Sequence, residues 1–597
     1  MTVGAEKTFD PILLAVLANR LDGICREMTN TLLRSGRSAV LNMARDFSCA
    51  LVTAGNELLA SAEGLPVHVI GMEFLAEAMT DLHTDLAEGD AFLHNDPYLG
   101  NTHSADHAIL VPVFYEGEHV FTACAKAHQA DCGNALPTTY MPGARDIYEE
   151  GALNFPCVRI QRGYEDVEDV IRMCRRRIRV PDQWYGDYLA GLGAARIAER
   201  RLKELCDQYG LRTITDFIRE WFDYSERRIV EAIRQLPGGT LIGRTTHDPY
   251  PGLPEGFPLE VKVHIDAEQG SIEVDLRDNP DNYPGGLNES RACATNNVIT
   301  GVFNSIDPDI PHNAGSFRRI NVLLREGCIA GIPKFPHSCS MATTNVADRL
   351  VCATQAAYAD LGDGFGLAEG CFGLPPAFAV ASGHDFRFGD APYVNQLFLG
   401  GGGGPGGPVA DGWPTYMLPV VAGLLYHDSI EVDEQKYPIH VHEQRLIPDS
   451  GGAGRRRGGL GTRVVFGPKG HRMTVAYTVE GHLHPARGVR AGRPGAATDA
   501  WKMGADGARI EIPKTAAVEL EPVERIVSTS GGGGGYGDPL DRDPDLVLAD
   551  VLEGWVSAAS AGLIYGVVLR GEPGSEELEV DEEATRAHRA ELRTRAG

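Results

Sequence analysis

The stretch HNDPYLGNTHSADHAILVPVFYEGEHVFTACAKAHQADCG, residues 94–133, organises the fold that the sequence predicts. Its middle contains two runs rich in apolar, β-branched and aromatic residues, 108–115 and 119–127, separated by Glu116-Gly117. Two such runs around a short turn that contains glycine are typical of a β-hairpin. We therefore expect two antiparallel strands, with histidine-rich segments on either side of their open end.

Two His-x-x-Asp units flank this hairpin, His103/Asp106 before it and His128/Asp131 after it. Facing residues in a hairpin lie at equal distances from the turn, so His128 is expected opposite Ala105 and Asp106. The same reasoning brings His103 close to Asp131. The two units are therefore predicted to meet at the open end of the hairpin.

This clustering of imidazole and carboxylate groups predicts a divalent metal site with His103, Asp106 and His128 as ligands. Such a cation needs ligands from at least two backbone segments at about 2.0–2.2 Å, and two imidazoles with one or two carboxylates suit Zn, Mn or Fe(II). Asp96 stays open between a ligand and a turn residue, because Asn-Asp-Pro is also a turn sequence. Asp46, which precedes an apolar strand, reads by itself as a strand-entry or capping residue.

A cation at this place supports hydrolysis or carbon–carbon bond formation, because it lowers the pKa of water and polarises carbonyl oxygens. His107 and Asp131 are the candidate catalytic residues, as orienters of the ligands or as general bases. The sequence contains no GxxxxGK[ST] phosphate loop and no GxSxG nucleophile elbow. Its two glycine runs, 400–404 and 531–535, are expected to form tight turns, so ATP binding by this chain is not expected.

The chain as a whole indicates a mixed α/β, multi-domain fold, since 597 residues exceed one ordinary domain. Helices are expected at 8–35, 72–86 and through most of 164–236, and two strands within 46–62. Three regions are predicted from changes in composition: a metal-bearing N-terminal region at 1–237, a β-rich, glycine-rich middle region at 238–470, and a small α/β C-terminal unit at 471–597.

Composition and charge bear on the partners of the chain. Hydrophobic residues make up 43% and charged residues 23%, as in a soluble globular protein. The formal net charge of -27 disfavours nucleic acid as a partner, because nucleic acid is itself a polyanion.

Neither a signal sequence nor an apolar run of membrane-spanning length occurs, so a cytoplasmic location without membrane contact is expected. The 12 cysteines form no CxxC pair and are expected to be reduced thiols.

Beyond these local patterns, the sequence resembles the hydantoinase B/oxoprolinase family over residues 8–570. The resemblance is specific because many motifs occur in one order: Arg45-Asp46-Phe-Ser-Cys, Asn95-Asp96-Pro-Tyr through His103 and Asp106, Ala127-His128, Asn313-Ala-Gly315, Asp449-Ser-Gly-Gly-Ala-Gly-Arg-Arg-Arg-Gly-Gly459, and Gly531 through Tyr536-Gly-Asp538-Pro539.

The resemblance implies a metal site at Asp46, His103, Asp106 and His128, and so adds Asp46 to the ligands. It also implies a hetero-oligomer with a hydantoinase A-type ATPase subunit, which binds ATP and phosphorylates the substrate. The implied activity is ATP-dependent opening of a cyclic amide such as a hydantoin, 5-oxoproline or another lactam. Two alternatives stay open: a ketone carboxylase of the acetone or acetophenone type, which would depend on bicarbonate, and a non-catalytic scaffold, which would lack the metal.

Overall fold

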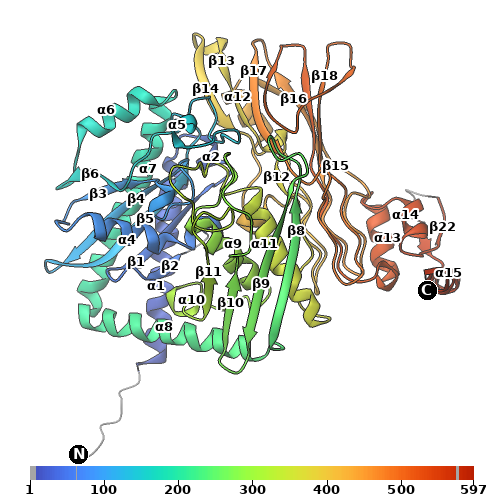
Figure 1. Ribbon diagram of the computed structural model, residues 1–597, viewed down its shortest axis with the longest axis horizontal. Coiled ribbons are helices and arrows are strands. Elements are labelled where there is room, and N and C mark those ends of the chain that lie inside the picture. The colour runs from blue at the N-terminus through green and yellow to red at the C-terminus, as the bar shows by residue number, and fades with distance from the viewer. Residues whose placement is uncertain (1–8, 62–63, 573–576, 597) are drawn as a thin grey trace, which may run out of the picture.

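The computed structural model describes residues 9–61, 64–572 and 577–596. In Figure 1 the N-terminal part of the chain, in blue and cyan, forms one side of the molecule. Strands of the later part stand upright at the top, and the last helices project at the opposite side. The expected mixed α/β, multi-domain fold is confirmed.

A seven-stranded sheet in the order β2-β1-β5-β4-β3-β6-β7 forms the centre of the N-terminal part. The expected hairpin is its middle, because β4 and β5 pair around Glu116 and Gly117, which both have positive φ. Both faces of the hairpin are buried, which explains its long apolar runs. The strands are β1 (Phe47–Thr53), β2 (Leu58–Ser61), β3 (Ala91–His94), β4 (Asp106–Tyr115), β5 (Glu118–His128), β6 (Val158–Arg162) and β7 (Glu165–Asp166).

Helices cover both faces of this sheet. The long helices α1, α7 and α8 share one hydrophobic core with one face, and α4 packs against the other. Pro181 is the first residue of α7. An N–H at this position would have no hydrogen-bond partner within the helix, so proline is tolerated there. The helices of this part are α1 (Pro11–Ser35), α2 (Ala39–Asn42), α3 (Pro66–Val69), α4 (Met72–Leu82), η1 (Pro97–Leu99), α5 (Ile147–Glu150), α6 (Glu168–Arg177), α7 (Pro181–Tyr209) and α8 (Leu211–Arg234).

A second, four-stranded sheet packs against helices α9 and α11. Its strands alternate between buried and exposed residues, so one face joins the core and the other meets solvent. The elements are β8 (Gly239–His247), β9 (Phe257–Asp266), β10 (Ser271–Asp275), β11 (Ile320–Leu323), α9 (Arg291–Phe303), α10 (Ala314–Phe317), α11 (Val346–Ala357) and η2 (Tyr358–Leu361).

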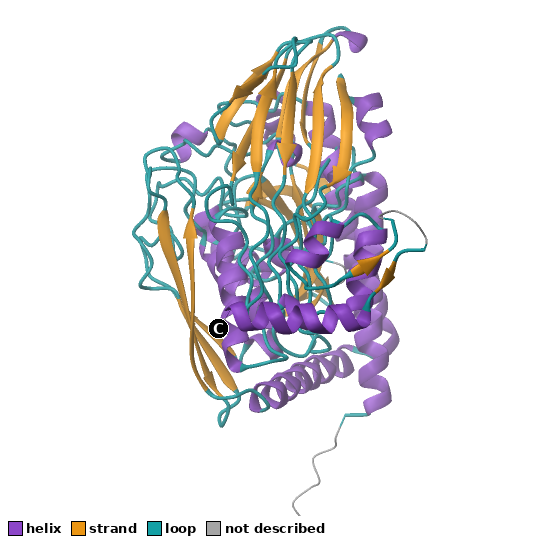
Figure 2. Cartoon of the chain, turned by 90° about the vertical axis from the view of Figure 1, so that its right-hand side faces the viewer, coloured by secondary structure: helices purple, strands orange, loops and turns teal. Residues whose placement is uncertain are grey.

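Two five-stranded sheets with a common core form the upper part of Figures 1 and 2. Their strands come from both sides of residue 470, since β17 pairs with β13 and β21 pairs with β16. The predicted region limits of 237 and 470 stay predictions. The elements are β12 (Gly373–Leu374), η3 (Pro376–Phe378), β13 (Val380–Asp385), η4 (Phe386–Phe388), β14 (Ala391–Gln396), η5 (Pro419–Val421), α12 (Ile430–Lys436), β15 (Ile439–Leu446), β16 (Thr462–Pro468), β17 (Met473–Val479), β18 (Asp499–Met503), β19 (Arg509–Glu511), β20 (Thr515–Leu520) and β21 (Arg525–Thr529).

The glycine runs do not form tight turns, and that prediction was wrong. Residues 400–404 and 531–535 instead run alongside other segments and form hydrogen bonds with them. The N–H of Gly403 donates to the carbonyl of Gly531, and the N–H of Gly533 donates to the carbonyl of Gly459. A Cβ on Gly533 would overlap the carbonyl oxygen of Gly404. Glycine is required here because the backbones approach too closely for any side chain.

The C-terminal helices form a small unit with its own hydrophobic cluster. Its elements are η6 (Pro539–Asp541), α13 (Pro544–Leu552), α14 (Ala558–Leu563), β22 (Leu569–Arg570), β23 (Glu579–Val580) and α15 (Glu582–Ala596).

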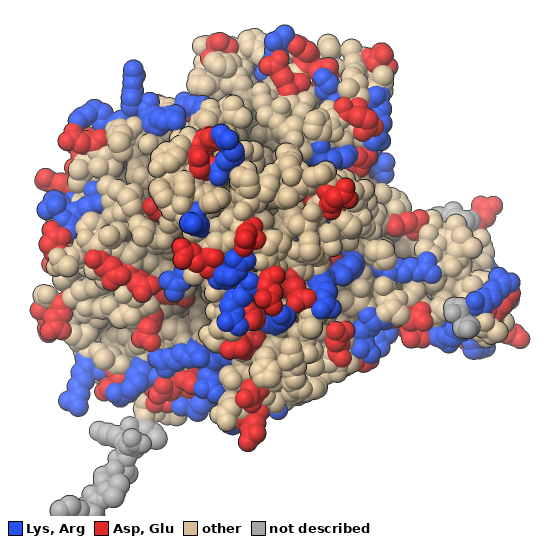
Figure 3. Space-filling model, viewed as in Figure 1, with Lys and Arg blue, Asp and Glu red and all other residues tan. Residues whose placement is uncertain are grey.

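Every cysteine of the chain is buried and outside any disulfide. Among the described helices, none combines the length and apolarity that a membrane crossing requires. On the face shown in Figure 3, basic side chains are interspersed with acidic ones.

Candidate metal centre

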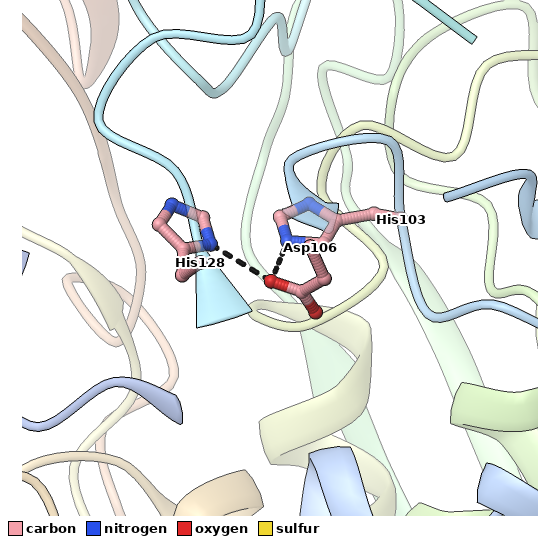
Figure 4. Close-up of side chains that lie close together, drawn as sticks. All are labelled: His103, Asp106 and His128. Carbon is pink, nitrogen blue, oxygen red and sulfur yellow. Dashed lines mark hydrogen bonds and ion pairs between the residues drawn. The ribbon is translucent and has the colours of Figure 1, made fainter. Parts of the chain in front are cut away.

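The hairpin register places two of the predicted ligands directly opposite each other. Asp106 begins β4, His128 ends β5, and the two residues pair across the strands as expected. His103 lies in the loop before β4, which is folded back because the Asn101 side-chain amide donates to the carbonyls of His103 and Asp106. The three side chains point toward one another in Figure 4.

Two imidazole nitrogens converge on one carboxylate oxygen. His103 Nε2 lies 3.1 Å and His128 Nδ1 lies 3.0 Å from Asp106 Oδ1. One ligand atom from each of the three residues lies within 4.8 Å of the others, and all three side chains are buried. A buried cluster of two imidazoles and a carboxylate has the donor set that Zn, Mn and Fe(II) accept.

The outward ring nitrogens of both histidines are also held. His103 Nδ1 lies 3.0 Å from the carbonyl oxygen of Ser340, which can only accept, so this nitrogen carries a proton. His128 Nε2 lies 3.2 Å from Thr139 Oγ1. In the neutral tautomer of His103, the lone pair of Nε2 therefore faces the Asp106 carboxylate. That arrangement needs a proton or a cation between the two groups, and it is the usual orientation of a metal-binding histidine.

Charge at the centre follows from burial and from these contacts. Burial alone would raise the pKa of Asp106, but the neighbouring imidazoles of His103 and His68 outweigh it and hold that pKa well below its usual range. Burial would lower the pKa of His103, but the Asp106 carboxylate outweighs it and raises that pKa. The centre thus keeps an ionised carboxylate in a buried place, where an opposite charge is needed to stabilise it.

Asp46 lies beside this group, together with His68, which no motif in the sequence had indicated. His68 Nε2 is 3.3 Å from Asp106 Oδ2 and 3.6 Å from Asp46 Oδ1. The main chain of Asp46 accepts the N–H of His128, and burial raises the pKa of its carboxyl group. His68 belongs to the short helix α3 and has no neighbouring ligand in the sequence, so local spacing carried no signal for it.

The two predicted catalytic residues lie outside the group of converging side chains. His107 follows Asp106 on β4 and therefore points to the other face of the sheet, where Trp184 Nε1 donates to its Nδ1 at 3.3 Å. Burial lowers the pKa of His107 to about 3, so its ring is neutral at ordinary pH. Asp131 binds Arg179, with 3.1 Å from Oδ1 to Nη1, and its carboxylate is not part of the cluster that His103, Asp106 and His128 form.

Asp96 is a turn residue, which is one of the two functions that the sequence had left open for it. Its Oδ1 accepts the backbone N–H of Tyr98 at 2.8 Å and caps the short helix η1. Its Oδ2 accepts from the side-chain amide of Asn154. These contacts occupy the carboxylate and hold the loop that leads to His103.

Tyr140 was also missed by the sequence analysis and forms one wall of the centre. Its ring stacks on those of His103 and His128, with centroid separations of 5.8 and 5.5 Å. The side-chain amide of Gln396, at the end of β14, lies 3.4 Å from the Tyr140 hydroxyl. Residues far apart in the chain therefore complete the centre.

Comparisons with known proteins agree on one family. The family model described as hydantoinase B/oxoprolinase matches residues 10–539. Caprolactamase subunit beta from Pseudomonas jessenii is 34% identical over 98% of this chain and 99% of its own length. Acetophenone carboxylase delta subunit from Aromatoleum aromaticum is 26% identical over 94% of this chain and 86% of its own length. The crystal structure of ATP-dependent caprolactamase from Pseudomonas jessenii matches with a TM-score of 0.84 and 31% identity, over 98% of this chain and 100% of that one.

Proposed function

Because the chain belongs to the hydantoinase B/oxoprolinase family, we propose that it is the metal-dependent subunit of an ATP-dependent cyclic-amide hydrolase. The observation that carries this proposal is the convergence of His103 Nε2 and His128 Nδ1 on Asp106 Oδ1. Asp46 and His68 stand beside this group and complete the proposed site.

The proposed ligands are His103, Asp106 and His128, with Asp46 as a further carboxylate. A divalent cation held there, Zn, Mn or Fe(II), supplies Lewis acidity that polarises a carbonyl oxygen and lowers the pKa of water. The protein's own part is to orient the imidazoles, through Ser340 and Thr139, and to keep bulk water out of a buried site.

A stable lactam needs activation before water can open its ring. We propose that a hydantoinase A-type ATPase subunit provides it by transferring a phosphoryl group from ATP to the amide oxygen, within a hetero-oligomer that includes this chain. The proposal is supported by the similarity over nearly the full length to caprolactamase subunit beta. ATP then binds to the partner, and this chain receives the activated substrate.

The test is ATP consumption by this chain together with its ATPase partner, measured across a panel of lactams and hydantoins and a panel of ketones. Each substrate is assayed with and without bicarbonate. The proposal predicts turnover of cyclic amides that is indifferent to bicarbonate and is lost in His128→Ala together with bound metal.

Other outcomes assign the chain differently. Ketone turnover that requires bicarbonate would make it a carboxylase subunit, a possibility raised by the similarity to acetophenone carboxylase delta subunit. Full cyclic-amide turnover in a His128→Ala complex without metal would contradict metal dependence. A chain that binds no metal and supports no turnover would be the scaffold that the sequence analysis left open.

A further inference from the structure

Glu150, the last residue of α5, is a buried carboxylate that the proposed function leaves unused. The residue is 3% exposed. Among the described residues, the charged group that acts on its pKa is the imidazole of His103, and not a lysine or an arginine. A buried carboxylate without a basic partner loses hydration that a salt bridge would otherwise replace, so its position needs a structural reason.

Two hydroxyl groups hold this carboxylate. Ser338 Oγ donates to Glu150 Oε2 at 2.9 Å, and the hydroxyl of Ser104 is the second partner. Burial raises the pKa of Glu150, while both hydroxyl groups and the His103 imidazole act in the opposite direction. Ser104 follows His103 in the loop before β4, and Ser338 lies just before Ser340, whose carbonyl contacts His103. Glu150 therefore joins the two segments that meet at this histidine.

A series of hydrogen bonds leads from Glu150 to the His103 ring. Ser338 Oγ, which donates to Glu150, accepts the N–H of Ser340 at 3.2 Å. The carbonyl of Ser340 accepts the proton on His103 Nδ1 at 3.0 Å. Because the proton is held at Nδ1, the lone pair of Nε2 is directed to Asp106 Oδ1, 3.1 Å away. The orientation of a proposed ligand thus depends on a carboxylate in another segment.

Main-chain contacts also hold the segment of Ser338 against α5. Ile147 N–H donates to the carbonyl of Pro336 at 3.1 Å, and Ser338 N–H donates to that of Arg145 at 3.2 Å. These contacts need no particular side chain on α5. The contact of Glu150 differs, because it acts on the hydroxyl group that accepts the N–H of the residue in contact with the histidine. A change at position 150 is therefore expected to disturb the histidine more than the backbone path of the segment.

We propose that Glu150 is a positioning residue of the metal centre and holds His103, through the two serines, in the orientation and tautomer that a bound cation requires. This inference rests on the proposed function, because it takes His103 as a ligand. In metal sites a carboxylate commonly contacts the second ring nitrogen of a ligand histidine directly, and its loss costs about 10- to 100-fold in metal affinity. Here a hydroxyl group and a main-chain carbonyl stand between the two, so the expected loss lies at the lower end of that range.

Titration of the metal-free, full-length protein with Zn²⁺ tests this inference. Glu150→Ala is expected to weaken Zn²⁺ binding about 10-fold. Glu150→Gln should lose less, because its amide oxygen can still accept from Ser338. The matched control is Glu199→Ala, which removes a similarly buried carboxylate that is ion-paired with Arg196 and Lys203 on α7. We expect the control to bind Zn²⁺ as wild type does.

The absorption spectrum of the Co²⁺-loaded protein separates a change at the centre from a general loss of stability. A rotated His103 ring alters the coordination geometry, so Glu150→Ala saturated with Co²⁺ should show shifted visible bands. Glu199→Ala should show the wild-type spectrum, even where urea unfolding finds it less stable. Ser338→Ala breaks the same series of hydrogen bonds and should give the same shift, and it replaces Glu150→Ala if that variant does not fold.

The possible outcomes are distinct. Wild-type Zn²⁺ affinity, or an unshifted Co²⁺ spectrum, in both Glu150→Ala and Ser338→Ala would overturn the inference and leave the proposed function standing. Failure of the proposed function looks different, because wild type itself would then bind neither Zn²⁺ nor Co²⁺, and the inference would fall with it.

Discussion

Asp106→Asn tests the candidate metal centre with the smallest change in shape. The carboxamide fills the same volume, but the negative charge that faces both imidazoles is lost. Asp106 Oδ1 contacts His103 Nε2 at 3.1 Å and His128 Nδ1 at 3.0 Å. A neutral amide oxygen is a weaker ligand for a divalent cation than a carboxylate. Loss of a residue that only supports a ligand costs about 10- to 100-fold in metal affinity, so loss of Asp106 as a ligand should cost at least that much.

The assay is metal content after gel filtration, followed by titration of the metal-free protein with Zn²⁺ or Mn²⁺. The matched control is Asp131→Asn, the same substitution at a similarly buried residue that pairs with Arg179 instead. We expect Asp106→Asn to lose metal and Asp131→Asn to keep it. Equal metal affinity in wild type and Asp106→Asn, with both proteins folded, would refute the assignment of the carboxylate as a ligand.

Three further predictions follow from other contacts. Thr139→Val removes the group that holds His128 Nε2 and should weaken metal binding about 10- to 100-fold, measured by the same titration; Thr139→Ser should restore it. Gly533→Ala should destabilise the protein by about 1–3 kcal/mol or more in urea unfolding, because its Cβ overlaps a backbone carbonyl; an unchanged midpoint would contradict the close packing. Burial raises the pKa of Asp433 to about 7, so its neutral form is favoured in the fold and stability should fall as pH rises from about 4 to 7. Asp433→Asn should flatten that dependence in thermal unfolding measured at each pH, and a slope equal to that of wild type would count against it.

The sequence by itself determined the hairpin and, to within one residue, its register. The turn at Glu116-Gly117 and the two apolar runs depend only on neighbouring residues, and together they place His128 opposite Ala105 and Asp106, of which the structure pairs Asp106. The ordered motifs likewise predicted the family over nearly the whole chain. Hydrophobic periodicity and turn residues can be recognised in a sequence because they depend only on neighbouring residues and not on distant segments.

The directions in which side chains point around the hairpin could be predicted only in part from the sequence. The alternation of β4 separates His107 from Asp106, although the density of ligand-type residues in this segment had suggested that the two act together. Asp131 follows the end of β5, where no strand register applies, and Arg179 from a later segment decides its position. Spacing alone therefore overestimated how many of these groups meet.

Tertiary structure alone decided the rest of the centre. His68 reaches Asp106 from a separate helix, and Tyr140 covers the imidazoles from the loop that follows the hairpin. The glycine runs gave no local sign of their close packing, because the carbonyl that excludes a side chain belongs to another segment. Such contacts join residues that are distant in sequence, and only the folded chain brings them together.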